Sequence, residues 1–365
     1  MTIQAVNASM IPETIRLSRV LLLLVALACN GASSAGPWSD TNLPPSNGND
    51  TVEVALNDLG GGTYKGFRGG LYPNGSNSAP AAHSAVGTAR AKNIRPLDAN
   101  GNPSPTGKYV LLSIGMSNTS QEFCGADITV NCLSETFMGQ AVADPTVNKS
   151  TLVIVNGAQG GRDAQNWISP SAQTFNEVRD QRLSRLGVTE RQVQVVWLKQ
   201  ADAGPTRLLP DSDADAYALE TRLGSIVRAL KVRYPNLQQV FITSRTYAGY
   251  ATSTLNPEPY AYESGFAVKW LIQAQIDQVQ RGSVVNMRAG DLDYNTVAPW
   301  IAWGAYPWAD GMKARSDGLQ WERADFGSDG THPSSAGRAK VGTMLLAFFR
   351  NSEWTRCWFV AGESC

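Results

Sequence analysis

Short, continuously apolar runs recur along the chain from residue 108 onward. They are rich in β-branched residues and cover residues 108–114, 151–156, 192–198 and 239–243, with a weaker fifth run at 284–287. Strands that are buried on both faces of a parallel sheet have this character, because apolar and polar positions do not alternate in them. The pattern therefore predicts five buried strands.

Amphipathic segments of helical period lie between and after these runs, at residues 213–234, 265–280 and 336–349. Alternation of strands and helices predicts a parallel sheet with helices on both faces. The expected fold class is α/β: a three-layer α/β/α sandwich around a central, mostly parallel, five-stranded sheet. We expect one domain of this kind over residues 106–365.

The first hundred residues lack this alternation. Residues 36–105 are rich in Gly, Asn, Ser and Pro, and we expect an irregular N-terminal arm packed on the core. Before it, the basic residues Arg16 and Arg19 precede an apolar run at 20–28, which is shorter than the about 20 residues that span a bilayer. Residues 1–35 are therefore interpreted as a signal peptide.

Alternatives remain open for this first segment. Translation could begin at Met10, and cleavage could follow Ala28 or Ala35. Residues just before Cys29 resemble a bacterial lipobox, so a lipid anchor at Cys29 is an alternative to free secretion. A buried strand or a short membrane anchor is a further reading. The segment favours a secreted or periplasmic protein, with a membrane-anchored lipoprotein as the alternative.

The composition argues against several classes of function. Lys plus Arg and Asp plus Glu number 31 each, whereas nucleic-acid binders are normally basic. His83 and His332 are the two histidines of the chain, too few for a histidine-based metal centre. We therefore expect no nucleic-acid partner, no metal and no cofactor. The composition leaves the oligomeric state open.

The cysteines fit an exported protein. Apart from Cys29, the chain has four, which form two local pairs eight positions apart: Cys124 with Cys132 and Cys357 with Cys365. An even number in an exported chain indicates disulfides, and proximity favours these two pairs among the three possible connectivities. Free buried thiols are the alternative.

Candidate catalytic side chains stand at two places. Ser117 directly follows the first predicted strand, where open α/β sheets bind ligands, and Gly115 permits a tight turn before it. Asp329 and His332 are three residues apart, so the carboxylate can reach the near ring nitrogen of the imidazole. Each of these residues could instead cap or pack against a helix. His83 has no acidic neighbour, so we expect it to serve packing.

Further candidates follow the second and third predicted strands. Gly160 and Gly161 would let a backbone N–H approach a substrate oxygen closely, although a simple glycine turn is the alternative. Gln200 offers a side-chain amide donor at the same edge of the sheet, although it could equally be a surface residue.

Taken in order, the four segments resemble the sequence blocks of the SGNH hydrolases, the superfamily of GDSL-type esterases, over about residues 108–350. The Gly-x-Ser at 115–117 resembles the nucleophile block, and the Asp-x-x-His-Pro at 329–333 resembles the closing block. The Gly-Gly-Arg-Asp at 160–163 is most similar to carbohydrate acetylesterases of that superfamily. The segment around Gln200 is similar to sialate O-acetylesterase-like members.

This resemblance implies a flavodoxin-like fold and a serine esterase. Ser117 would be the nucleophile, His332 the general base and then acid, and Asp329 the residue that orients the imidazole. The oxyanion donors would be the backbone N–H of Ser117, Gly161 and the amide of Gln200, which stands in place of the usual Asn.

The resemblance also implies an acylated carbohydrate as substrate, most simply an O-acetyl ester. Trp303 and Trp308 lie in an aromatic stretch and could stack on sugar rings, and Asn118 and Gly160 would complete a substrate-binding set. Core packing is an equal alternative for the tryptophans. The alternative functions are a lipolytic or aryl esterase on the same fold and, from a different class, a non-catalytic carbohydrate-binding protein.

Overall fold

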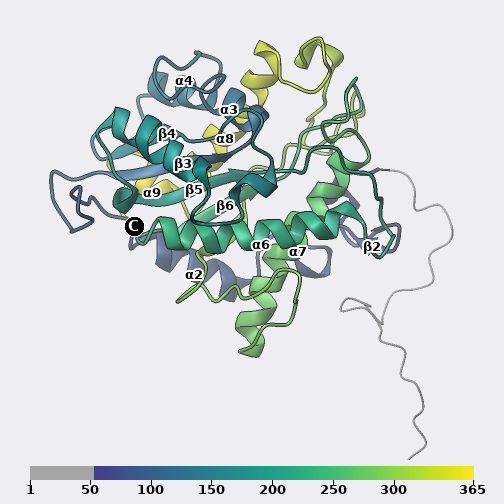
Figure 1. Ribbon diagram of the computed structural model, residues 1–365, viewed down its shortest axis with the longest axis horizontal. Helices are drawn as coiled ribbons and strands as arrows, with labels where there is room; N and C mark the ends of the chain where they lie inside the picture. Colours follow the sequence, from purple (N-terminus) through teal and green to yellow (C-terminus); the bar gives the residue numbers. More distant parts are fainter. Residues whose placement is uncertain (1–52) are drawn as a thin grey trace, which may run out of the picture. The chain divides into compact units, whose positions relative to one another are not determined.

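A parallel five-stranded sheet forms the centre of the computed structural model, which describes residues 53–365 (Figure 1). Its strands are β3 Tyr109–Gly115, β4 Leu152–Asn156, β5 Val193–Lys199, β6 Gln239–Thr243 and β7 Trp300–Trp303. Their order is β4-β3-β5-β6-β7, and every neighbouring pair is parallel. Every residue of β3 and β5 is buried, as expected of strands covered on both faces. The predicted fold class is confirmed.

The predicted fifth strand is wrong. Residues 284–287 form no strand, and Val284 and Met287 are exposed on the surface. The fifth strand is instead β7, which pairs with β6 from Gln239 opposite Trp300 to Ile242 opposite Trp303. Its sequence, WIAW, has one β-branched residue among two tryptophans and an alanine, so it lacks the composition that marks the other four strands.

Helices cover both faces of the sheet. The main ones are α3 Ser117–Phe123, α4 Phe137–Ala143, α6 Asp215–Arg233, α7 Tyr260–Arg281 and α8 Ser335–Asn351. Helices α3, α4 and α8 contact one another, α6 packs along α7, and the two groups lie on opposite sides of the sheet (Figure 1). The three predicted helices correspond to α6, α7 and α8, although α7 begins at Tyr260, ahead of the predicted start.

Shorter elements complete the described chain. The helices are α1 Leu56–Leu59, α2 Ala81–Ala91, α5 Gln173–Glu177 and α9 Arg356–Phe359, and a small hairpin pairs β1 Thr63–Tyr64 with β2 Phe67–Arg68. Directly after α5 comes the six-residue π-helix η3 Val178–Leu183. The short 3-10 helices are η1 Pro73–Gly75, η2 Ala164–Trp167, η4 Ser184–Leu186, η5 Glu190–Gln192 and η6 Arg323–Asp325. Within residues 53–365, no helix has the length and apolar character needed to cross a membrane. The predicted signal peptide, the alternative start at Met10 and the lipid anchor at Cys29 lie outside the described residues.

The N-terminal arm is less irregular than predicted, because it contains the eleven-residue helix α2. The buried residues of α2 are His83, Gly87 and Ala91, which recur every four positions and so share one face. A Cβ at Gly87 would lie 2.4 Å from a ring atom of Trp300, so this face packs directly on β7. Small residues leave little hydrophobic periodicity in the sequence, which is why the helix was not predicted.

His83 serves packing, as expected. It is buried, its ring stacks on Trp300 with 5.0 Å between centroids, and its Nε2–H donates to the carbonyl oxygen of Ile301 at 2.9 Å. Burial lowers the pKa of His83 to about 4, although the hydrogen bond to Ile301 opposes this shift. The native state therefore holds a neutral imidazole.

This burial predicts acid sensitivity. Between about pH 6.5 and about pH 4 the unfolded chain binds a proton at His83 that the native state does not. The stability that comes from keeping His83 neutral is complete above about pH 6.5 and is lost as the pH falls toward about 4. We expect the free energy of unfolding, measured in urea at pH 7 and pH 5, to fall more steeply in the wild type than in His83→Gln. An equal fall in the free energy of unfolding in both proteins would contradict the conclusion that the native state keeps His83 neutral.

Both predicted disulfides are present. Cys124 is bonded to Cys132 just after α3, and Cys357 is bonded to Cys365 at the C-terminus. The first closes a loop immediately beyond the helix that begins with Ser117, so it limits the freedom of that loop.

We expect the double variant Cys124→Ala/Cys132→Ala to lower the free energy of unfolding by about 2.6 kcal/mol, because an open loop of about nine residues gains conformational entropy in the unfolded chain. Urea unfolding under non-reducing conditions measures the difference. A double variant with the same free energy of unfolding as the wild type would show that closing this loop does not stabilise the fold.

Candidate active site

A cavity of about 360 Å³ opens at the carboxyl ends of the central strands. Its walls come from the loops after β3, β4, β5 and β6 and from the loop before α8. Ser117, His332, Asn118 and Gly161 all line it. Four of the predicted site residues, from three separate segments of the sequence, are thus brought to one hollow, at the edge where parallel α/β sheets bind ligands.

Ser117 is placed by a tight junction between β3 and α3. Gly115 ends β3, and a Cβ there would lie 2.3 Å from both the carbonyl oxygen of Lys199 and the Oγ1 of Thr119. Only glycine fits this approach. The Thr119 hydroxyl donates to the Lys199 carbonyl at 2.8 Å, which fixes the start of α3 against the end of β5. Ser117, as the first residue of α3, is presented at the edge of the sheet.

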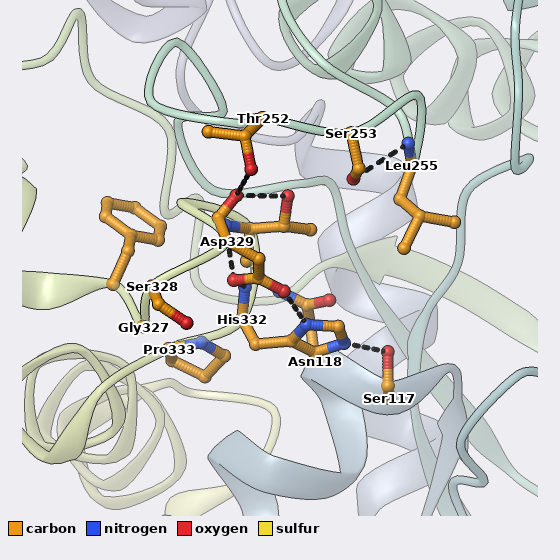
Figure 2. A network of polar contacts seen from close by, with 12 residues as sticks. Ser117, Asn118, Thr252, Ser253, Leu255, Gly327, Ser328, Asp329, His332 and Pro333 are labelled. Carbon is orange, nitrogen blue, oxygen red and sulfur yellow. Dashed lines mark hydrogen bonds and ion pairs between the residues drawn. The ribbon is translucent and has the colours of Figure 1, made fainter.

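Ser117, His332 and Asp329 form a continuous hydrogen-bonded chain (Figure 2). The Ser117 Oγ lies 2.8 Å from His332 Nε2, and His332 Nδ1 lies 2.5 Å from Asp329 Oδ2. The second carboxylate oxygen of Asp329 accepts the backbone N–H groups of Thr331 and His332, both at 3.0 Å. Both carboxylate oxygens are therefore occupied, and the imidazole can turn in neither direction without losing a bond.

The loop that carries His332 is itself fixed. Gly330 has φ +65°, and a Cβ there would lie 1.8 Å from the carbonyl oxygen of Tyr250. The Asp329 carbonyl accepts the backbone N–H of Thr252 at 3.0 Å, and also the hydroxyl of Thr252, a contact drawn in Figure 2. The loop after β6 therefore supports the position of the Asp329 carboxylate.

Electrostatics favour an ionised Asp329. Burial raises the pKa of this carboxyl. The hydrogen bonds from the His332 ring and from the N–H groups of Thr331 and His332 lower it by more than burial raises it, so the pKa falls to about 2. The carboxylate is thus charged at neutral pH and accepts the Nδ1–H of His332. This tautomer leaves Nε2 free to accept the hydroxyl proton of Ser117.

The two glycines after β4 differ in their placement. Gly161 lines the cavity with φ +69°, and no atom lies within 4 Å of the place where a Cβ would be. Gly160 lies outside the cavity lining, and its N–H donates to Asp127 Oδ1 at 2.7 Å, so this N–H is already engaged within the protein. Of the pair, Gly161 is the one that faces the site.

The structure contradicts the predicted oxyanion role of Gln200. Its side chain is fully buried outside the cavity lining, and its Nε2 donates to the carbonyl oxygen of Arg162 at 3.3 Å. Gln200 follows directly on β5 and lies beneath the loop after β4, so its amide holds that loop instead of reaching a ligand. It supports the segment that carries Gly161.

Asn118, a predicted substrate-binding residue, lines the cavity but is 2% exposed. Its Nδ2 donates to the carbonyl oxygen of Thr331 at 2.8 Å. It therefore joins the start of α3 to the loop that carries His332, and so keeps Ser117 and the His332 imidazole at a fixed separation.

The predicted sugar contacts of Trp303 and Trp308 are wrong. Both tryptophans are buried in the core and neither lines the cavity. The indole N–H of Trp303 donates to the carbonyl oxygen of Leu71 at 2.6 Å, and that of Trp308 donates to Glu258 Oε1 at 2.8 Å. Because Trp303 belongs to β7, its side chain packs within the fold, which is the alternative that the sequence left open.

The sequence reasoning missed several polar residues of the cavity wall. Arg245 follows β6, Asp202 follows β5, and Asn256 lies in the long loop before α7 with φ +58°. A charged residue two or three positions after a buried strand is a usable signal for Arg245 and Asp202, whereas nothing in the sequence marks Asn256. Within residues 53–365, no cluster of three or more His, Cys, Asp or Glu side chains could hold a metal ion.

No family model matches the chain, and no curated protein matches it. Among solved structures, a carbohydrate esterase family 2 enzyme of Corynascus thermopiles (Myceliophthora fergusii) matches at 14% identity over 67% of this chain and 66% of that one, with a TM-score of 0.34. A carbohydrate acetylesterase from Xanthomonas citri matches at 12% identity over 67% of this chain and 56% of that one, with a TM-score of 0.34. An extracellular lipase from Streptomyces rimosus matches at 13% identity over 65% of this chain and 99% of that one, with a TM-score of 0.32.

Further matching structures carry the names SGNH hydrolase and GDSL-like lipase, which belong to the superfamily that the sequence blocks resemble. Identities of 12–14% and TM-scores below 0.5 are too low to transfer an activity from these proteins to this chain. The function is therefore inferred from the geometry of the site.

Proposed function

We propose that the protein is a secreted serine esterase that hydrolyses O-acyl esters, above all O-acetyl esters, on carbohydrates. The observation that carries this proposal is the chain from Ser117 through His332 to Asp329, with its hydroxyl end at an open cavity. A serine, an imidazole and an ionised carboxylate in this arrangement are the parts of a nucleophilic triad, whatever the order of the residues in the sequence.

The geometry accounts for each step of acyl transfer. His332 Nε2 takes the proton of Ser117 as the Ser117 oxygen attacks the ester carbonyl carbon, and the N–H groups of Ser117 and Gly161 are the donors for the resulting oxyanion. The imidazolium, stabilised by Asp329, then protonates the departing saccharide oxygen. An acyl-enzyme remains, and water activated by His332 releases the free acid and restores the serine.

The cavity wall supports a polyhydroxylated leaving group. Most of the residues that line the cavity are polar or charged, and Arg162, Asp163 and Asn166 among them are partly exposed. Side chains of these types can exchange hydrogen bonds with the hydroxyl groups of a saccharide, whereas a long acyl chain offers them no such partner. The volume of the cavity suits a small ligand.

Export is supported by two further features. Both disulfides join residues of the described chain, and disulfides persist in oxidising compartments. The apolar run at 20–28 has the length of a signal-peptide core. Mass spectrometry of the N-terminal peptide of the mature protein distinguishes free secretion from anchoring through a lipid on Cys29, because the lipid adds mass to that peptide.

A hydrolysis screen tests the proposed substrate class. O-acetylated mono- and oligosaccharides are compared with nitrophenyl esters of increasing acyl length. We expect release of acetate from the saccharides and a fall in kcat/KM as the acyl chain of the nitrophenyl esters lengthens. A kcat/KM that rises with chain length would identify a lipolytic enzyme, and saccharide binding without turnover would identify a binding protein.

A further inference from the structure

The segment that carries Gly161 is a pliable part of the cavity wall. Gly160 and Gly161 are both exposed, and no atom lies within 4 Å of the place where a Cβ of Gly161 would be. Glycine has more conformational freedom than any other residue, and here two follow each other. Because packing does not limit this freedom at Gly161, polar contacts must fix the direction of its backbone N–H.

The flanks of this segment are anchored. Before the glycines, the N–H of Gln159 donates to the carbonyl oxygen of Gly115 at 3.0 Å. After them, the carbonyl oxygen of Arg162 accepts the indole N–H of Trp167 at 3.2 Å and the amide of Gln200 at 3.3 Å. The N–H of Arg162 also reaches the Gln159 carbonyl, at 3.4 Å, which is long for a hydrogen bond. The peptide groups of the two glycines depend on a contact from another part of the chain.

Asp127 makes that contact. Its Oδ1 accepts the backbone N–H of Gly160 at 2.7 Å, and its Oδ2 would lie 3.0 Å from a Cβ at Gly160. A hydrogen bond to a carboxylate is about twice as strong as one between neutral groups. Among the residues that the structure describes, none accepts the N–H of Gly161. The first glycine is therefore held, and the N–H of the second is left for a ligand.

Asp127 is itself held by the helix that begins with Ser117. Its φ is +50°, in the left-handed region, which Asp adopts more readily than most residues do. Its N–H donates to the Oγ of Ser120, a fully buried residue of α3, at 2.9 Å, and its carbonyl oxygen accepts Nη1 of Arg182. An uncommon backbone conformation persists where the surrounding structure enforces it. The carboxylate is thus presented to Gly160 from a backbone that is fixed to α3.

The disulfide loop, residues 124–132, also fixes Asp127 to the sheet. The carbonyl oxygen of Ile128 accepts Nδ2 of Asn156 at 2.7 Å, and the Oγ1 of Thr129 accepts the Asn156 N–H at 3.0 Å. Asn156 is the last residue of β4. The loop therefore joins the end of β4 to α3.

We propose that Asp127 is a positioning residue of the oxyanion site: it holds the backbone of Gly160 so that the N–H of Gly161 meets the oxyanion formed when Ser117 attacks the ester. This inference rests on the proposed function and adds a residue to it. Asp127 lies outside the cavity lining, so it acts through Gly160 and touches no reacting atom. A displacement of about 1 Å in an active site can lower the rate about a hundredfold.

Asp127→Ala tests the proposal with nitrophenyl acetate as the substrate. We expect kcat to fall about ten- to a hundredfold and KM to change less than about twofold, because an oxyanion donor acts mainly in the transition state. Asp127→Asn is expected to keep most of the wild-type kcat, since its amide oxygen can accept the same N–H. An unchanged kcat in Asp127→Ala, an equal loss in both variants, or a loss confined to KM would overturn the proposal.

Asp98→Ala is the matched control. Asp98 is another loop aspartate, and its Oδ1 accepts the backbone N–H groups of Asn100 and Asn102 at 2.9 and 2.8 Å. It lies outside the cavity lining, so we expect the kcat and KM of the wild type. A fall in kcat as large as that of Asp127→Ala would show that the loss of any such loop contact slows the enzyme, and would contradict the proposal.

Gly160→Ala disturbs the same contact and leaves Asp127 in place, so it serves where Asp127→Ala does not fold. The added Cβ forces the Asp127 carboxylate to shift, and we expect kcat to fall about three- to tenfold. The double variant Gly160→Ala/Asp127→Ala should be no slower than Asp127→Ala, because both substitutions act on one contact. An unchanged kcat in Gly160→Ala, or losses that multiply in the double variant, would overturn the proposal. Failure of the proposed function is a separate outcome, since the folded wild type would then hydrolyse no ester.

Discussion

Ser117→Ala is expected to lower kcat for ester hydrolysis about a millionfold while the protein stays folded, because removing the nucleophile of a triad removes the acyl-enzyme route. The substitution deletes one hydroxyl whose bond to His332 Nε2 is 2.8 Å long. A single such bond contributes about 1 kcal/mol to stability, so the thermal unfolding midpoint should change little. Acetate release and thermal unfolding measure the two effects.

Two companion variants complete this prediction. His332→Ala should lose about as much activity as Ser117→Ala, and the double variant should lose no more, since the two residues act as a unit. Ser150→Ala is the matched control, because Ser150 is exposed and precedes β4, at the opposite edge of the sheet. A folded Ser117→Ala protein with substantial activity would contradict the assignment of the nucleophile.

Lys199→Met is expected to lower the free energy of unfolding by about 3–5 kcal/mol, because it leaves a buried carboxylate without its partner. Lys199 ends β5 and Glu122 lies in α3, and the lysine Nζ is 2.7 and 2.6 Å from the two carboxylate oxygens. Both side chains are shielded from solvent almost completely. Burial lowers the pKa of Lys199, and the charge of Glu122 opposes that shift.

The double variant Lys199→Met/Glu122→Leu tests the cause. It removes both charges, so it should be more stable than Lys199→Met alone. Arg356→Met, which breaks an exposed ion pair with Glu363, should cost much less. Urea unfolding of the wild type, of these three variants and of Glu122→Leu alone measures these differences. A double variant that loses the sum of both single effects would show that the ion pair itself is not the source of the loss.

Most of the sheet could be predicted from the sequence because burial on both faces leaves a direct trace there. The ends of β3, β4, β5 and β6 each lie within one residue of the ends of the predicted runs. The sequence does not predict β7, because a strand that begins and ends with Trp300 and Trp303 has the composition of a ligand-binding aromatic patch. Its identity as a strand depends on pairing with β6, which is a tertiary contact.

The hydrogen-bonded chain from Ser117 to Asp329 could be predicted because its spacing is local or tied to the end of a strand. Asp329 and His332 are three residues apart, and Ser117 follows β3 directly. Gln200 obeys the same rule of position, yet its amide turns to the Arg162 carbonyl. Position at a sheet edge fixes where a residue is, whereas the direction of its side chain depends on neighbours from other loops.

The remaining wall of the cavity could be predicted only in part. Arg245 follows a buried strand, so its place at the sheet edge was available from the sequence, but the lack of hydrogen-bond partners for its Nε and Nη2 atoms within the described chain was not. Asn256 lies in the irregular loop between β6 and α7 and reaches the cavity through a contact with the carbonyl of Asp202. No periodicity or motif records such a contact.

Labelling with a fluorophosphonate tests the central claim most directly, because this reagent reacts with a serine only where a base activates the hydroxyl. The folded wild type is treated with the reagent and the modified peptide is identified by mass spectrometry. We predict one adduct, on Ser117, and its loss in both Ser117→Ala and His332→Ala. A wild-type protein that takes no label, or takes it on a different serine, would contradict the account of Ser117 as an activated nucleophile.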